Sequence, residues 1–120
     1  MTHESLLLAG VNYADGMKRF GGNSAIYEKY LVRFPQDPNY HELMLALSQK
    51  DYDAAFKHAH ALKGLVGNLS LERLYKQIVP LVEALRAGQV TGLDPLAAAV
   101  SESYRLIVDA IAADQPSDPA

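Results

Sequence analysis

Apolar side chains recur at intervals of three and four residues along most of the chain, which is the spacing of an amphipathic α-helix. Two short helices are expected first, over residues 2–9 and 12–20. Longer helices follow, over residues 24–34, 39–48, 51–69, 71–87 and 95–113. No segment keeps up the alternation of apolar and polar residues that a half-buried strand requires. The sequence therefore predicts an all-α chain.

Helix-capping residues support these boundaries. Asparagine, aspartate and serine side chains satisfy the N–H groups at the start of a helix. Such residues stand at five predicted starts: Asn12, Asn23, Asp51, Ser70 and Asp94. Pro80 is expected to kink the helix in which it lies, because proline removes one backbone hydrogen bond. Long helices with short connections predict an up-and-down four-helix bundle, here with short extra N-terminal helices.

The composition narrows the class of protein. The chain has 120 residues, 49% of them apolar, which suits one domain; we expect it to span residues 1–113, with a disordered polar tail over 114–120. It has no cysteine, which excludes disulfides. Its net charge of −3 argues against nucleic acid as the main partner. The start, MTHESLLLAG, resembles neither a signal peptide nor a membrane span, so we expect a cytoplasmic protein without membrane association.

The helix predicted over residues 51–69 has one apolar face and one unusual outer face. At about 100° of rotation per residue, an apolar stripe is expected to face the core. The stripe consists of Ala55, Ala59, Leu62, Val66 and Leu69. His60 points the opposite way. The residues that share its side of the helix are Phe56, Lys57, Lys63, Gly64 and Gly67.

The two glycines on this outer face need an explanation, since glycine in a helix interior is less favourable than alanine by roughly 1 kcal/mol. Gly64 and Gly67 lie one and two turns after His60, where missing side chains leave room for another surface. Lys63 lies three residues after His60, so its ammonium can reach a negative group on the ring. The pattern predicts an exposed histidine with a cation beside it and space for a partner.

The string His60-Ala61-Leu62-Lys63-Gly64 stands between Ala59 and Gly67-Asn68-Leu69. It resembles the signature of the histidine-phosphotransfer (HPt) domains of multistep two-component signalling. The resemblance extends from about Gly10 to about Gly88 and includes Phe20-Gly21-Gly22-Asn23. The sequence departs from the family at Ser70, where many relatives carry glycine, and at Pro80. We attribute the first departure to the expected capping role of Ser70.

The resemblance implies a phosphocarrier rather than an enzyme. His60 would accept a phosphoryl group from the phospho-aspartate of a receiver domain, in a hybrid histidine kinase or a response regulator, and pass it to another receiver aspartate. Mg²⁺ is expected on the partner receiver, so the carrier itself would need no cofactor. Lys63 would offset the added charge. The docking surface for the receiver would consist of Phe56, Lys57, Ala59, Gly64 and Gly67. A small bundle of this kind is expected to act as a monomer.

Less specific interpretations of the same residues stay open. His60 and Lys63 would be ordinary solvated side chains on any other helix, Lys57 fits that description better than a functional one, and Phe56 fits the core as well as the surface. His58 is expected at the core boundary, about 200° around the helix from His60, so the two cannot share a metal. The next helix is expected to bring polar side chains near His60, with Tyr75, Lys76 and Gln77 as candidates.

Two other functions compete with the carrier. A bundle of the HPt type that docks receiver domains without transfer would be an adaptor, and its binding would not depend on His60. An enzyme with its own kinase or phosphatase activity is disfavoured. The chain has no nucleotide loop of the G-x-x-x-x-G-K-[ST] kind and no acidic cluster arranged for Mg²⁺ beside His60. No metal site is expected in this chain.

Overall fold

The computed structural model describes residues 3–114, and within them helices account for the regular structure apart from one isolated antiparallel bridge between Val11 and Leu71. In chain order the elements are α1 (Glu4–Leu8), α2 (Tyr13–Arg19), α3 (Ser24–Arg33), the 3₁₀ helix η1 (Phe34–Gln36), α4 (Asn39–Ser48), α5 (Tyr52–Asn68), α6 (Glu72–Arg86) and α7 (Asp94–Asp114). The all-α prediction is confirmed. Residues 115–120 of the predicted tail lie outside the described residues.

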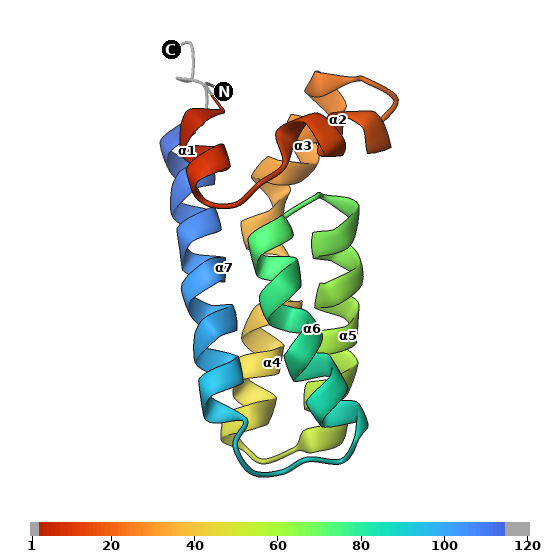
Figure 1. Ribbon diagram of the computed structural model, residues 1–120, viewed down its shortest axis with the longest axis vertical. Helices are drawn as coiled ribbons and strands as arrows, with labels where there is room; N and C mark the ends of the chain where they lie inside the picture. Colours follow the sequence, from red (N-terminus) through yellow and green to blue (C-terminus); the bar gives the residue numbers. More distant parts are fainter. Residues whose placement is uncertain (1–2, 115–120) are drawn as a thin grey trace.

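The long helices stand side by side and run alternately up and down (Figure 1). Helices α3, η1 and α4 follow one another as the first rod; α4 packs against α5, α5 against α6, and α6 against α7. Aromatic rings close the fourth side, because Tyr40 of α4 stacks on Tyr104 of α7 with ring centroids 3.7 Å apart. This arrangement confirms the predicted up-and-down four-helix bundle with short extra N-terminal helices.

One apolar core joins these helices. Its largest fully buried side chains are Tyr27, Phe34, Leu6, Leu31, Leu43, Leu62, Leu71, Leu74, Ile78, Leu81, Ile107 and Ile111. Full burial of one such aliphatic side chain stabilises a fold by about 1.5–3 kcal/mol. The core therefore holds α5 firmly against its neighbours. Helix α6 continues through Pro80, which lies on its exposed side.

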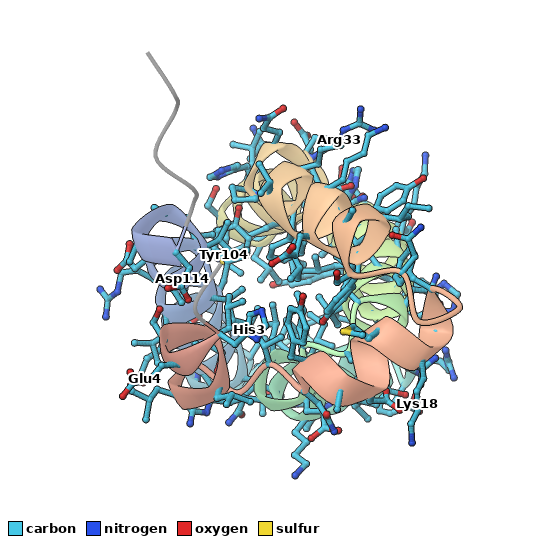
Figure 2. The ribbon with its side chains drawn as sticks, turned by 90° about the horizontal axis from the view of Figure 1, so that it is seen from above. His3, Glu4, Lys18, Arg33, Tyr104 and Asp114 are labelled. Atoms are coloured by element: carbon cyan, nitrogen blue, oxygen red, sulfur yellow. The ribbon has the colours of Figure 1, made fainter. Side chains whose placement is uncertain are left out.

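The short helix α1 packs beside the last turns of α7 at one end of the bundle, which Figure 2 views from above. The Ser5 hydroxyl donates a hydrogen bond of 2.5 Å to the Asp114 carboxylate, and Asp114 is only 8% exposed. Helix α7 extends to Asp114, one residue beyond the predicted domain boundary.

Among residues 3–114, no helix combines the length and the apolar character needed to cross a bilayer.

Three of the predicted helix caps are confirmed. The side chains of Asn12, Asn23 and Asp51 each accept a hydrogen bond from the backbone N–H three residues later. Asp94 is the first residue of α7. The fifth predicted cap, Ser70, has a different role that belongs to the candidate site.

Candidate functional site

His60 lies on the exposed side of α5, opposite the core. Four residues of the predicted stripe, Ala55, Ala59, Leu62 and Val66, have no exposed surface, and Leu69 is also buried. Because this stripe faces the interior, the imidazole of His60 projects outward, and the residue is exposed. The predicted orientation of this helix is confirmed.

Ala59 cannot contribute to a docking surface, because it is completely buried. It directly precedes His60, and one residue of helical rotation, about 100°, turns it into the core. The prediction that Ala59 contacts a partner is therefore wrong. Adjacency to His60 in the sequence does not place a residue on the same face of the helix.

The two glycines beside His60 have different surroundings. A Cβ atom added at Gly64 would meet nothing from other parts of the protein within 4 Å, so the surface there is open. A Cβ atom at Gly67 would lie 3.4 Å from Cε2 of Tyr75, because the Tyr75 ring of α6 covers that position. Gly64 therefore provides the clearance expected beside the imidazole, whereas Gly67 accommodates a ring of the protein itself.

Phe56 precedes His60 by one helical turn. Its ring lies nearly parallel to the imidazole, with an interplanar angle of 25° and centroids 5.8 Å apart. It also packs against the core, and the guanidinium carbon of Arg86 lies 5.6 Å from the centre of its ring. Phe56 thus packs against the core and also lies beside the His60 ring. Lys57 is exposed on the same helix.

A hollow of about 690 Å³ opens beside His60. Lys63 and Gly64 of α5 line it together with His60, and Gly67 also borders it. Two of the three polar candidates from the next helix, Tyr75 and Lys76, line the same hollow, and Gln77 does not. Phe56 and Lys57 lie outside its lining. The structure therefore brings together four of the predicted site residues on α5.

Helix α2 forms another side of the hollow through Asp15 and Arg19. The start of α2 is bound to the turn between α5 and α6, because the Asn12 N–H donates to the Ser70 carbonyl at 2.9 Å and the Asn12 side-chain amide donates to Glu72 at 2.8 Å. Sequence reasoning missed Asp15 and Arg19. No local spacing encodes a contact between segments this far apart along the chain.

The Asp15 carboxylate connects α2 to this turn. It accepts a hydrogen bond of 2.6 Å from the Ser70 hydroxyl and one of 3.0 Å from Nε of Arg19. The Ser70 hydrogen bond and then the Arg19 guanidinium hold the pKa of Asp15 below its usual value. Asp15 is therefore ionised at neutral pH and keeps both partners.

Ser70 is not the N-cap of α6, so that prediction is wrong. Its φ is +58°, in the left-handed region that glycine adopts without strain. Leu71 takes the cap position and makes no side-chain capping bond. The turn needs a left-handed residue before α6 can begin, a conformation that glycine adopts more easily than serine. Serine keeps the conformation, and its hydroxyl binds Asp15.

Three positively charged side chains border the hollow: Arg19, Lys63 and Lys76. Two acidic residues, Asp15 and Glu72, also line it. Both acids already accept hydrogen bonds from protein groups, Asp15 from Ser70 and Arg19, and Glu72 from Asn12. Three cations against two acids leave a small excess of positive charge in the lining, which favours an anionic group beside His60.

His58 occupies the boundary position predicted for it. It is half-buried, and its Nδ1 lies 3.0 Å from Oδ1 of Asn39 in α4. In the part of the chain that the structure describes, no three His, Asp or Glu side chains gather in a way that could hold a metal ion.

Comparison with protein families relates this geometry to a known domain. The model of the Hpt domain matches residues 36–114, which include α4 to α7 and the helix that carries His60. No curated protein and no solved structure gave a significant match. The family match covers more than half of the chain, and its residues form most of the four-helix bundle. The chain therefore belongs to the Hpt domain family.

Proposed function

We propose that His60 is the phosphoryl-carrying residue of this Hpt domain. Hpt domains transfer phosphoryl groups through a histidine in phosphorelays, and they interact with receiver domains. In this protein His60 accepts the group from the phospho-aspartate of one receiver domain, in a hybrid histidine kinase or a response regulator. It then passes the group to the aspartate of another receiver.

The observation that supports this proposal most directly is the open surface at Gly64. His60 is exposed, and no other part of the protein approaches the Cβ position of Gly64 one turn later. A receiver must bring its aspartate to within bonding distance of the imidazole. Because Gly64 has no side chain, the partner can lie directly against the helix beside the ring.

The reaction is a substitution at phosphorus. One ring nitrogen of the neutral imidazole donates its lone pair to phosphorus, while the bond from phosphorus to the aspartate oxygen breaks and the carboxylate leaves with that electron pair. The other ring nitrogen keeps its proton. Histidine suits this step because its neutral, nucleophilic form is well populated near pH 7. Transfer to the carboxylate of a second receiver restores His60.

Other residues of the site have supporting roles in this proposal. Lys63, three residues after His60 and on the same hollow, offsets the negative charge of the phosphorylated ring. Lys57 and the outer face of Phe56 contact the receiver next to His60. We assign the Mg²⁺ that polarises the acyl phosphate to the receiver domain. We expect the protein to act as a monomer. We expect it to act in the cytoplasm.

Transfer of labelled phosphate from a panel of phosphorylated receiver domains tests the proposal. The wild type is compared with His60→Gln and with His58→Gln, a matched control because His58 lies on the same helix but binds Asn39. We expect the wild type and His58→Gln to gain a label that is labile in acid and stable in alkali. His60→Gln should gain none while keeping the helical circular-dichroism spectrum.

Two results would contradict the proposal. A label that persists on His60→Gln would place the chemistry on another residue. If no form is labelled although all of them bind a receiver, the protein is a non-transferring adaptor of the HPt type.

A further inference from the structure

Arg19 is the positively charged residue of the hollow that does not come from the four-helix bundle. It lies on α2, and the Hpt family match begins only at residue 36. Lys63 and Lys76 lie within the matched range, on α5 and α6. The rim of the His60 hollow thus contains a cation contributed by a helix outside the matched domain.

A chain of hydrogen bonds holds Arg19 at this rim. Its Nε donates to Asp15, Asp15 accepts from the Ser70 hydroxyl, and Ser70 lies in the turn that follows α5. The position of Arg19 is therefore linked to the helix that carries His60. The guanidinium has five N–H donors, and only the Nε–H takes part in the bond to Asp15. Its two terminal nitrogens carry the other four.

The Asp15–Arg19 ion pair contributes little to folding. It joins residues four apart on one short helix, and 51% of the Arg19 side-chain surface is exposed. Exposed pairs of this kind stabilise proteins only weakly, because water screens the charges. Stability alone therefore does not account for an arginine that is bonded at the edge of this hollow to Asp15, which is itself held by Ser70.

We propose that Arg19 is a docking residue that binds a carboxylate on the surface of the receiver domain seated over His60, with Asp15 and Ser70 as its positioning residues. The proposal rests on the proposed function of His60. The planar guanidinium suits a carboxylate, because its parallel N–H groups match the two oxygens. We assign the phosphoryl group itself to Lys63, which lies on the same helix as His60 and one turn away.

The neighbouring Lys18 supplies a matched control. It carries the same charge on the same helix, but it does not line the hollow, and Figure 2 shows it on the outer side of α2. Arg19→Gln and Lys18→Gln therefore remove one positive charge each at nearly the same place in the chain. Arg19→Lys keeps the charge and removes the planar fork.

The test measures steady-state transfer from the phosphorylated receiver that labels the wild type fastest, with a second, unphosphorylated receiver in excess so that each carrier molecule returns to free His60 and turns over. For Arg19→Gln we expect KM for this receiver to rise about 10-fold with kcat within about 2-fold, because a docking contact acts equally on the ground state and the transition state. Lys18→Gln should change KM by less than about 2-fold. The KM of Arg19→Lys for this receiver should lie between that of the wild type and that of Arg19→Gln.

A small donor separates the receiver carboxylate from the phosphoryl group. Phosphoramidate phosphorylates histidine without a protein partner, so the labelling rate of Arg19→Gln by phosphoramidate should equal that of the wild type. A rate that falls 10-fold with this donor would mean that Arg19 acts on the phosphoryl group, and would overturn the proposal. Equal KM values for Arg19→Gln and Lys18→Gln would also overturn it.

Binding distinguishes this inference from the proposed function. If the wild type binds receivers but accepts no label, the function proposed for His60 fails. The Arg19 contact is then measured as affinity for the unphosphorylated receiver that binds the wild type most tightly. We expect Arg19→Gln to bind it about 10-fold more weakly than Lys18→Gln does, and equal affinities would refute the contact.

Discussion

The hydroxyl of Ser70 donates a 2.6 Å hydrogen bond to the carboxylate of Asp15, although 55 residues separate them in the chain. This bond joins α2 to the turn that follows the His60 helix. Ser70 makes it from a left-handed backbone conformation, with φ +58°, and from a position that is only 4% exposed. The contact therefore couples a strained turn to one wall of the candidate site.

Substitutions at Ser70 should separate the backbone conformation from the hydrogen bond. Ser70→Ala keeps the unfavourable φ and loses the bond, so we expect the free energy of unfolding to fall by about 1–2 kcal/mol. Ser70→Gly loses the same bond but relieves a left-handed conformation that is unfavourable by roughly 1–2 kcal/mol for other residues. Its stability should lie within about 1 kcal/mol of the wild type. Urea unfolding measures the stability of both variants, and an equal loss of unfolding free energy in Ser70→Ala and Ser70→Gly would contradict this account.

The lowered pKa of Asp15 makes part of the stability dependent on acid. The unfolded carboxyl has a pKa near 3.8, and the folded one lies below it because of Ser70 and Arg19. The paired carboxylate therefore stabilises the fold above pH 3.8, and this contribution is lost as the pH falls through the lowered pKa. When unfolding is measured from pH 7 to pH 2, the free energy of unfolding should fall less for Asp15→Asn than for the wild type.

The exposed Glu102 of α7 provides the control for this pH experiment. Glu102→Gln should keep the acid dependence of the wild type, since the Asp15 contacts stay intact. An Asp15→Asn curve that runs parallel to the wild-type curve over the whole range would show that Asp15 contributes nothing to acid sensitivity.

Replacement of Gly64 should separate folding from partner access. Gly64→Arg places a long side chain into open space and replaces a helix glycine, so stability should stay the same or rise by up to about 1 kcal/mol. Transfer from receivers should be blocked by steric exclusion, while labelling by phosphoramidate persists. Gly64→Ala should transfer within a few-fold of the wild type. Normal transfer by Gly64→Arg would refute the clearance argument.

Gly16 should tolerate no side chain. A Cβ atom there would lie 2.1 Å from Cζ of Tyr27, whose hydroxyl donates a 2.6 Å hydrogen bond to the Leu69 carbonyl. Gly16→Ala must displace this buried ring, so we expect a loss of about 2–3 kcal/mol in unfolding free energy. Tyr27→Phe, which removes only the hydroxyl, should lose about 1–2 kcal/mol. Thermal unfolding of both variants checks that Gly16→Ala loses more stability than Tyr27→Phe.

The bundle was predictable from the sequence because its helices bury one face and begin at side-chain caps. Apolar residues such as Ala55 and Val66 define the buried side of α5, and that assignment is enough to turn His60 outward. Asn23 and Asp51 cap their helices as predicted, because a cap depends only on residues a few positions away.

Tertiary contacts were not predictable in the same way. Arg19 borders the His60 hollow because Asn12 and Asp15, at the start of α2, bind the α5–α6 turn, and no periodicity in the sequence predicts such a contact. Serine is common at helix caps, but Ser70 occupies a turn that requires a left-handed φ, and the residue type does not reveal that requirement. Ala59 is next to His60 in the sequence, but helical rotation places it in the core, so its position along the chain does not make it part of the docking surface.

The bridge between Val11 and Leu71 has a mechanical consequence. Its neighbours add two backbone hydrogen bonds, from the Asn12 N–H to Ser70 and from the Arg73 N–H to Gly10. The N-terminal segment and the start of α6 therefore share backbone hydrogen bonds, and opening one of them breaks bonds made by the other. A force applied to α2 therefore reaches the backbone at the end of the His60 helix, because Asn12, which precedes α2, is hydrogen-bonded to Ser70.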